Sequence, residues 1–398
     1  MTRIVSTRRP STVQPVNYAA WIPLETAGLV VGTAAYPSKL SGDEIVIKNH
    51  AVAVNPVDWK IQASGGFGLE YPAILGEDVA GEVIEVGAGV KAATGLDLKP
   101  GDRVITHALG IGTGNPQYGG FQLYPRLKAV TVAKIPDDIP FWSAVVLPLS
   151  ISTAAAGLYL KANLGLKFPN NHVDGSENEQ ERGVFGNDRN DEYQHQEQAQ
   201  SPREEHHKRN RDTLLLWGGS SSVGSSVIQL AVASGYRVIA TASPSNYDYV
   251  KSLGASLVLD YHNPDIESIL ISVLQSQRAG KLVGAYDAIG SDATARASAR
   301  VVHAIGGGRV ASVVSAPADD DVPRDVEITR IGSGNIVSQE DGLVARKIWG
   351  EWVPKALANG ALRPKPDELV VGRGLYYVQA GLDRQREGVS ARKVVVTL

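Results

Sequence analysis

The stretch that decides the fold covers residues 214–233 and reads Leu-Leu-Leu-Trp-Gly-Gly-Ser-Ser-Ser-Val-Gly-Ser-Ser-Val-Ile-Gln-Leu-Ala-Val-Ala. It passes from an apolar strand, through a turn poor in large side chains, into an apolar helix. Glycines let the backbone turn sharply and let a ligand come close, while the N–H groups and the positive dipole end of the helix face the negative charge of that ligand. The stretch therefore predicts a pyrophosphate-binding turn formed by Gly218, Gly219, Ser220, Ser221, Ser222, Val223 and Gly224.

The next apolar run, residues 237–242, ends where the adenosine ribose of a dinucleotide is expected, and no acidic residue follows it. Enzymes that select NAD usually place Asp or Glu there, and such a carboxylate would repel the 2′-phosphate of NADP. Here the chain reads Thr-Ala-Ser-Pro-Ser-Asn over residues 241–246. The hydroxyl and amide donors favour NADPH as cofactor. The candidate contacts are Ser243, Ser245 and Tyr261, with Ile289 added from the end of a later strand.

A second interpretation of the same residues is structural. Ser243, Ser245 and their neighbours can simply form a turn and cap a helix that begins near Asn246. The missing acid is the main reason to prefer the cofactor interpretation.

Strand and helix patterns alternate through the central part of the chain, which predicts an α/β fold with a doubly wound parallel sheet of the Rossmann type. The predicted strands there are residues 214–217, 237–242, 257–260, 286–289 and 309–314. The N-terminal part is instead rich in β-structure and turns, with strands at 44–53 and 78–86 and a turn at 99–104 that leads into a third. Helical patterns begin at Ser143, and we expect the terminal strand at 393–398 to rejoin the N-terminal domain.

Composition limits the class of protein. The 398 residues suffice for two domains, and 43% hydrophobic with 20% charged residues is typical of a globular protein. A net charge of −3 gives no reason to expect nucleic acid or a membrane surface as partner, and no apolar run was expected to approach the length of a membrane span. The absence of cysteine excludes disulfides, thiolate zinc sites and a cysteine nucleophile.

Two segments fall outside this scheme. The first thirteen residues are basic and rich in hydroxyl groups, and we interpret them as a disordered start of a cytoplasmic protein rather than an organelle presequence. Residues 169–212 are so polar that they cannot offset their chain entropy by apolar burial, and they are predicted to form a disordered insertion. Polar composition explains the histidines of this insertion better than a metal site does; they are His172, His195, His206 and His207.

Four motifs in order resemble the medium-chain dehydrogenase/reductase superfamily: Asn-Pro-Val-Asp-Trp-Lys at 55–60, Leu-Gly-Glu-Asp-Val-Ala-Gly-Glu-Val at 75–83, Lys-Pro-Gly-Asp-Arg-Val at 99–104, and the glycine turn at 218–224. The resemblance covers residues 17–398 apart from the polar insertion. Within the superfamily the chain looks like the fungal enoyl reductases that partner polyketide synthases, and like their quinone-oxidoreductase-like relatives. The resemblance implies a GroES-like catalytic domain at 1–150 and 345–398 and a Rossmann NADP-binding domain at 151–344.

The chain departs from this family at the metal site. Zinc alcohol dehydrogenases hold their metal with a cysteine where this chain has Asn55, and with the histidine of a Gly-His-Glu run where it has Gly76, Glu77 and Asp78. The four-cysteine lobe is missing as well. Glu77 and Asp78 stand without recognisable partner ligands and are interpreted as structural, so no metal is expected. Ser221 stands where related reductases usually have a glycine, and its hydroxyl is a candidate phosphate contact.

Hydride transfer to a carbon activated by conjugation needs no zinc, and the resemblance supplies three candidate catalytic residues. Asn55 can donate to the substrate carbonyl. Lys60 can place a cation near the enolate or a cofactor phosphate, although a solvated surface lysine is an equal alternative. Thr153 matches a position near the nicotinamide, although a helix residue bonded back to its own carbonyl is an equal alternative.

Three further residues have weaker assignments. Tyr71 and Tyr118 either line the pocket and donate a proton or simply pack. Lys393 either reaches the adenosine phosphate, as the related fold implies, or is a solvated lysine.

Together these observations predict an NADPH-dependent, zinc-independent reductase of activated C=C bonds, in an enoyl thioester or an enone, that serves secondary metabolism. An NADPH-dependent quinone oxidoreductase is the nearest alternative, and a non-catalytic NADPH-binding sensor or scaffold protein is the second. The resemblance implies a small-molecule or thioester substrate and a polyketide synthase as partner, and it is compatible with a monomer or a homodimer.

Overall fold

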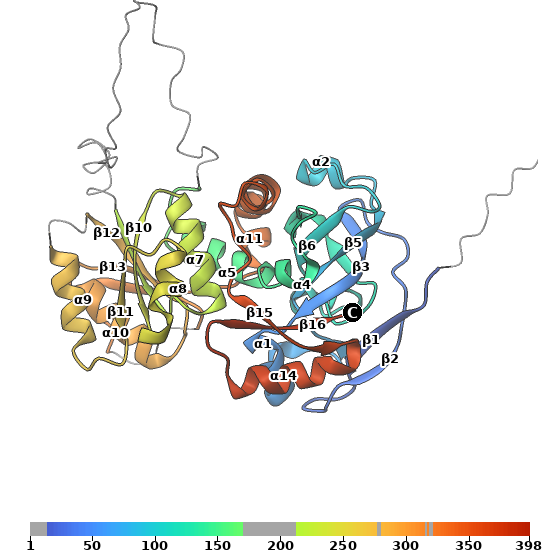
Figure 1. Ribbon diagram of the computed structural model, residues 1–398, viewed down its shortest axis with the longest axis horizontal. Coiled ribbons are helices and arrows are strands. Elements are labelled where there is room, and N and C mark those ends of the chain that lie inside the picture. Colours follow the sequence, from blue (N-terminus) through green and yellow to red (C-terminus); the bar gives the residue numbers. More distant parts are fainter. Residues whose placement is uncertain (1–13, 170–211, 277–279, 315–316, 318–320) are drawn as a thin grey trace, which may run out of the picture.

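The computed structural model describes residues 14–169, 212–276, 280–314, 317 and 321–398. The predictions for the first thirteen residues and for the polar insertion with its four histidines lie outside the described residues. The described chain forms two halves, each built around its own sheet, and α5 (Pro148–Tyr159) lies between them (Figure 1).

The central half contains a six-stranded parallel sheet in the order β11-β10-β9-β12-β13-β14. Leu214 and Leu216 of β9 pack on the face of α5 and α7, whereas Leu215 and Trp217 pack on the opposite face with α9 and α10. This alternation follows from the two-residue period of a strand, and burial on both faces explains the unbroken apolar run. The elements are β9 (Thr213–Trp217), α7 (Ser222–Ala233), β10 (Arg237–Ala242), η4 (Pro244–Asn246), α8 (Tyr247–Ser252), β11 (Leu257–Asp260), α9 (Ile266–Gln275), β12 (Leu282–Asp287), α10 (Asp292–Ala304), β13 (Gly308–Ser312) and β14 (Val326–Arg330).

Four details of this sheet differ from the sequence prediction. Strand β12 ends at Asp287 rather than 289, because Asp287 Oδ1 accepts from the N–H groups of Ile289 and Gly290 and so forms a turn. It also begins four residues early, at Leu282, where Gly284 interrupts the apolar pattern at a register shift. Strand β13 stops at Ser312, and strand β14 was not predicted at all.

The second half contains a larger, mostly antiparallel sheet in the order β15-β16-β3-β5-β6-β8, with β7 paired to β3. The expected return of the C-terminal strand is confirmed, since Val395 of β16 pairs with Ala53 of β3. A three-stranded sheet, β2-β1-β4, completes this half. The strands are β1 (Asn17–Ile22), β2 (Val30–Ala34), β3 (Glu44–Ala53), β4 (Ala73–Ile74), β5 (Asp78–Val86), β6 (Arg103–His107), β7 (Arg126–Lys128), β8 (Val132–Lys134), β15 (Asp367–Arg373) and β16 (Arg392–Thr397).

Short helices complete this half, and one of them, α4, leads into α5. Helix α1 contacts α14, and helix α13 follows a π-helical turn, η6, that packs near β8. The helices are α1 (Pro56–Ser64), η1 (Gly66–Gly68), α2 (Val90–Thr94), α3 (Gly110–Thr113), η2 (Pro116–Tyr118), η3 (Ala129–Thr131), α4 (Phe141–Ala144), α11 (Asn335–Ser338), η5 (Glu340–Gly342), α12 (Leu343–Ala345), η6 (Arg346–Trp352), α13 (Val353–Ala358), η7 (Leu375–Tyr377) and α14 (Val378–Glu387).

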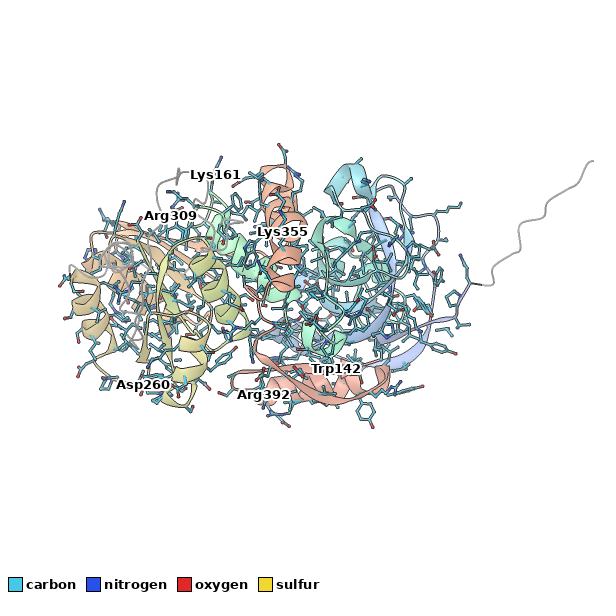
Figure 2. The ribbon with its side chains drawn as sticks, turned by 45° about the horizontal axis from the view of Figure 1, so that its top comes forward. Trp142, Lys161, Asp260, Arg309, Lys355 and Arg392 are labelled. Atoms are coloured by element: carbon cyan, nitrogen blue, oxygen red, sulfur yellow. The ribbon has the colours of Figure 1, made fainter. Side chains whose placement is uncertain are left out.

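The chain after α5 is fixed to the Rossmann sheet. Arg309 on β13 donates from Nη1 to Lys161 O at 2.7 Å and to Asn163 O at 2.9 Å. Figure 2 labels Arg309 and Lys161 near each other at this end of the sheet. The segment between α5 and the polar insertion is therefore anchored to β13 at Lys161 and Asn163.

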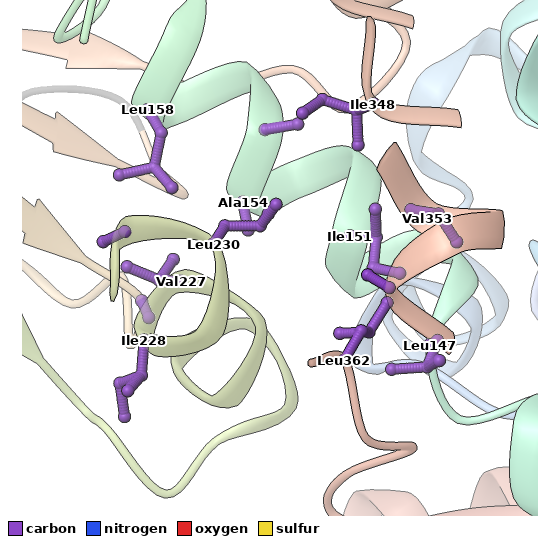
Figure 3. Packing of buried hydrophobic residues seen from close by; sticks show 14 of the residues in the cluster. Leu147, Ile151, Ala154, Leu158, Val227, Ile228, Leu230, Ile348, Val353 and Leu362 are labelled. Atoms are coloured by element: carbon purple, nitrogen blue, oxygen red, sulfur yellow. The ribbon is translucent and has the colours of Figure 1, made fainter. Parts of the chain in front are cut away.

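Helix α5 forms the core that joins the two halves. Figure 3 shows Ala154 and Leu158 beside Leu230 of α7. At the other end of α5, Leu147 and Ile151 lie beside Val353 and Leu362. All of these residues belong to one buried cluster, so α5 is packed at both of its ends.

One expectation about hydrophobicity was wrong. The segment Phe141–Tyr159 has 19 residues and a mean hydropathy of 1.6, which is long and apolar enough for a membrane span by composition alone. However, 72% of its most apolar window is buried inside the protein. This is the behaviour of a core helix, which passes the same compositional test.

Candidate active site

The glycine turn has the geometry that its sequence predicts. Gly218 has a φ of +86°, and a Cβ there would lie 2.4 Å from Ile289 Cδ1. A Cβ at Gly224 would lie 2.2 Å from the carbonyl oxygen of Gly218. Gly218 therefore requires glycine for its backbone angle, and Gly224 requires it for the close approach of a backbone atom.

Ser221 is the N-cap of α7. Its φ of −71° is one that any residue adopts, so no glycine is needed there. Its hydroxyl donates to Gly218 O at 2.9 Å and accepts from Gly224 N at 3.0 Å. The hydroxyl thus has a role within the turn itself, and its contact with a phosphate stays a prediction.

The turn also contains main-chain N–H groups that can bind a ligand. Within the described part of the chain, the structure gives no acceptor for the main-chain N–H groups of Ser220, Ser222 and Val223. They lie at the N-terminus of the twelve-residue helix α7, at the carboxyl end of β9, between β10 and β12. This is the switch point of the sheet, where open α/β folds bind their ligands, so the residues fit a dinucleotide pyrophosphate.

Two of the three residues proposed for the 2′-phosphate lie together. Ser243 Oγ donates to Tyr261 Oη at 3.2 Å, although the two residues belong to different strand ends. Tyr261 is 43% exposed, and Ser245 is exposed as well. Asn246 donates from Nδ2 to Ser390 Oγ at 3.0 Å, which links this loop to the segment before β16. Ser243 and Asn246 occupy the N-cap positions of η4 and α8, as the alternative interpretation expects, but neither side chain makes a capping hydrogen bond.

A cavity of about 360 Å³ opens beside Tyr261. Trp217 and Ile266 line it together with the first turns of α10. Its two guanidinium groups already have carboxylate partners, since Arg300 pairs with Glu267 at 2.6 Å and Arg296 with Asp321 at 3.1 Å. The aromatic and apolar walls suit a flat base more than a second phosphate.

Asn55 lies at the centre of a buried polar network. Its Nδ2 donates to Asp78 Oδ2 at 2.7 Å, and its Oδ1 accepts from Lys393 Nζ. Lys393 Nζ also lies 2.8 Å from Asp78 Oδ2, and both side chains are almost fully buried. Asp78 Oδ1 accepts from Leu149 N at 2.5 Å, so the network connects β5 and β16 to the first turn of α5.

This network corrects the assignment of Lys393. The side chain neither reaches an adenosine phosphate nor is solvated, because its ammonium is buried between Asn55 and Asp78 in the other half of the protein. A buried ammonium is retained only when it is paired, and the carboxylate of Asp78 provides the opposite charge.

Asp58 supports the same region from α1. Its Oδ2 accepts from Asn55 N at 2.8 Å and its Oδ1 from Gly76 N at 3.2 Å. Burial, together with the nearby charges of Glu77 and Asp78, raises the pKa of Asp58 to about 8. The backbone at Asn55 is thereby fixed independently of its side chain.

Glu77 has a partner that the sequence did not reveal. Its Oε2 lies 2.7 Å from His107 Nε2, and both side chains are buried. This contact gives Glu77 a structural partner, in line with the interpretation of Glu77 as a structural residue. His107 is the last residue of β6, and strand register alone places it opposite Asp78, so no motif or short spacing in the sequence could identify it.

The remaining candidates lie in different environments. Thr153 Oγ1 donates to Leu149 O at 2.7 Å, which is the helix back-bond of the alternative interpretation, and its side chain is 9% exposed. Lys60 is exposed on α1, with Nζ 5.8 Å from the centroid of the Trp59 ring. The structure brings neither of them into contact with Asn55, although Asp78 connects Asn55 to Leu149, one turn before Thr153.

The hydroxyl groups of Tyr71 and Tyr118 have different surroundings. Tyr118 Oη donates to the buried Glu44 carboxylate, so its hydroxyl hydrogen already takes part in a structural hydrogen bond. The Tyr71 hydroxyl is buried and has no hydrogen-bond partner among the described residues, and burial raises the pKa of Tyr71.

Comparison with known proteins agrees with this architecture. Residues 41–137 match the alcohol dehydrogenase GroES-like domain, and residues 222–339 match the zinc-binding dehydrogenase domain. A trans-enoyl reductase from Aspergillus japonicus is 39% identical over 384 residues, which are 96% of this chain and 98% of that protein.

Solved structures share the fold. The CurK enoyl reductase superposes with a TM-score of 0.68 at 18% identity, over 96% of this chain and 99% of that one. A mycobacterial protein complexed with NADPH superposes with a TM-score of 0.62 at 21% identity, over 96% and 100% of the two chains.

A parallel sheet with a glycine turn at its switch point, beside a β-rich GroES-like domain, defines an oxidoreductase that uses a nicotinamide cofactor. The chain belongs to the medium-chain dehydrogenase/reductase superfamily and is an enoyl reductase-like oxidoreductase within it.

Proposed function

We propose that this protein is a zinc-independent, NADPH-dependent reductase of activated C=C bonds, with an enoyl thioester or an enone as substrate. The observation that carries the proposal is the polar network around Asn55. Where zinc-dependent relatives place a cysteine ligand, this chain has an amide held between Lys393 and Asp78. Where they place a histidine ligand, it has Glu77 bonded to His107. These groups bond to one another, and none of them is a thiolate that would bind a soft metal.

The cofactor is proposed to lie along the carboxyl edge of the Rossmann sheet. The N–H groups of Ser220, Ser222 and Val223 would bind its pyrophosphate. Ser243, Ser245 and Tyr261 would bind the 2′-phosphate, and Ile289 would pack over the turn at Gly218. The cavity lined by Trp217 and Tyr261 would receive the adenine. When bound, reduced NADP supplies a hydride.

The catalytic half is proposed to stabilise the negative charge that develops on the substrate carbonyl. An amide nitrogen carries two hydrogens, and Asn55 Nδ2 has one acceptor, Asp78, within the described part of the chain. The second hydrogen would bind the carbonyl oxygen, where a donor held in place is worth most. Lys60 would add positive charge from α1, and Thr153 would border the nicotinamide from α5.

The test is consumption of NADPH, followed by the loss of its absorbance with a chelator present, against an enoyl thioester, a simple enone, a quinone and, in reverse, an alcohol. Turnover of the thioester or the enone that is indifferent to the chelator supports the proposal. Preference for the quinone favours a quinone oxidoreductase instead. NADPH binding without turnover of any acceptor favours a sensor or scaffold protein.

The finer features of the proposal rest on resemblance. A polyketide synthase would present the thioester in the cytoplasm, and the protein would act as a monomer or a homodimer. The catalytic domain would comprise residues 1–150 and 345–398, with the cofactor domain at 151–344.

A further inference from the structure

The position of Lys393 calls for an explanation, because it is one of the largest fully buried side chains and carries a positive charge. Burying an ammonium and a carboxylate together is at best a balanced exchange with water, and apolar residues would fill the same space at lower cost. Lys393 and Asp78 are 2% and 0% exposed. The buried pair is therefore weak evidence for a stabilising role, and its presence suggests a functional role instead.

The contacts that Lys393 and Asp78 make with the Asn55 amide indicate what this role is. An ammonium only donates hydrogen bonds, so Lys393 must face Oδ1 of Asn55. A carboxylate only accepts them, so Asp78 must face Nδ2. The two charged groups thus permit one orientation of an amide whose two ends are otherwise similar in shape.

We propose that Lys393 is a positioning residue, which with Asp78 fixes the Asn55 amide so that a hydrogen of Nδ2 stays directed at the substrate carbonyl. The inference rests on the proposed function, in which Asn55 is the donor. Asp78 also binds Leu149 N at 2.5 Å, so the same pair holds the start of α5, the helix of Thr153, in register with Asn55.

Removing the ammonium leaves Asp78 as the only one of the two charged groups that still selects an orientation of the amide. In Lys393→Met the buried Asp78 carboxylate loses its counter-charge, and Asn55 Oδ1 loses its donor. In Lys393→Met combined with Asp78→Asn both charges of the pair are removed together, so most of the stability lost in the single variant is expected to return. However, the new amide at position 78 keeps its oxygen towards Leu149 N and presents its NH2 group to Asn55, so it no longer selects the native orientation of the Asn55 amide.

The experiment measures kcat, KM and NADPH affinity with an enoyl thioester for wild type, Lys393→Met, Lys393→Arg and the double variant. Thermal unfolding of each variant reports stability separately. Because the contacts proposed for the cofactor belong to the other half, NADPH affinity is expected to stay within about twofold in all four proteins. Lys355→Met, which removes an exposed lysine of α13 labelled in Figure 2, is the matched control.

We expect kcat to fall about ten- to a hundredfold in Lys393→Met and to stay low in the double variant although its stability recovers. Lys393→Arg, which retains a group that only donates, should keep more of kcat than Lys393→Met. A double variant as active as wild type, or an arginine variant less active than the methionine variant, overturns the positioning role. An inactive wild type overturns the proposed function and this inference together, whereas the first two results overturn the inference alone.

Discussion

Glu77 Oε2 and His107 Nε2 lie 2.7 Å apart in the interior of the GroES-like half, and each side chain is at most 7% exposed. Their other polar atoms, Glu77 Oε1 and His107 Nδ1, are buried and have no partner among the described residues. The position that binds zinc through a histidine in related dehydrogenases thus holds a carboxylate in this chain, and an imidazole from a different strand satisfies one of its oxygens.

The first prediction concerns the stability of this pair. Glu77→Leu leaves His107 Nε2 buried without a partner, so the free energy of unfolding should fall by about 1–3 kcal/mol. Glu77→Leu combined with His107→Phe removes both polar groups and should recover part of that loss. Urea unfolding at neutral pH measures the difference. Glu351→Gln, which breaks an exposed pair with Lys347, is the control and should change stability by about 0.5 kcal/mol or less. Equal losses in the single and double variants would contradict the pairing.

The second prediction concerns the glycine turn. A Cβ at Gly224 would lie 2.2 Å from the backbone oxygen of Gly218, and a backbone atom cannot move aside as a flexible side chain can. Gly224→Ala should therefore distort the turn and weaken NADPH binding by about tenfold or more, equivalent to about 1.4 kcal/mol. Fluorescence titration with NADPH measures the affinity. Gly112→Ala, at a site with no atom within 4 Å of the added Cβ, should leave the affinity unchanged. Unaltered binding in Gly224→Ala would place the pyrophosphate elsewhere.

The fold could be predicted from the sequence because its signals are local. The run that ends at Trp217 and the glycines after it define a strand, a turn and a helix through neighbouring residues alone. The strand at β12 was misplaced because Asp287 ends it through side-chain bonds to the next turn, and Gly284 interrupts its apolar pattern.

The catalytic region was less predictable because its contacts join residues far apart in the chain. Lys393 meets Asn55 across 338 positions, and nothing near either residue indicates the contact. His107 meets Glu77 across 30 positions through strand pairing. By contrast, the motif resemblance did direct attention to Asn55, whose burial is consistent with a fixed amide.

The third prediction concerns the choice of cofactor. Ser243 and Tyr261 are within 3.2 Å of each other at the strand ends where the 2′-phosphate is proposed to bind. Ser243→Asp places a carboxylate there, which repels a phosphate and can accept the two ribose hydroxyls of NAD. The affinity for NADPH should fall about tenfold or more, while the affinity for NADH stays constant or rises. Titration with both cofactors, and with Ser243→Asn as the uncharged control, measures the change. An equal loss for both cofactors would argue against a 2′-phosphate contact.

The fourth prediction concerns the buried carboxylate of Glu44. Burial alone would raise its pKa, but hydrogen bonds from Tyr118, Ser41 N and Lys128 outweigh burial and lower the pKa to about 2. Arg126 Nη1 lies 3.8 Å away, and Asp43 shares Lys128 at 3.2 Å. A carboxylate whose pKa is lower in the folded state stabilises the protein above its unfolded pKa, and this stabilisation disappears as the pH falls towards the folded value.

Glu44→Gln should therefore unfold more easily than wild type near neutral pH. The difference between the two proteins should narrow as the pH falls from about 4.5 towards 2. Urea unfolding at several pH values in this range measures it, and Glu368→Gln, on an exposed edge strand, serves as the control. A difference that is constant with pH would show that the carboxylate of Glu44 has the same pKa in both states.

The fifth prediction concerns Lys60, which is exposed on α1, five residues after Asn55. If its ammonium stabilises the developing enolate, Lys60→Met should lower kcat/KM for an enoyl thioester by about tenfold, because a cation near the reacting charge is lost. Lys60→Arg should retain most of the activity. NADPH affinity distinguishes the two roles considered for this residue: it stays constant if Lys60 faces the substrate and falls if Lys60 binds a cofactor phosphate. Steady-state kinetics combined with NADPH titration resolve these cases, and Lys355→Met controls for the loss of an exposed lysine. Unchanged kinetics and unchanged affinity in Lys60→Met would identify a solvated surface lysine whose ammonium lies 5.8 Å from the Trp59 ring and takes no part in the reaction.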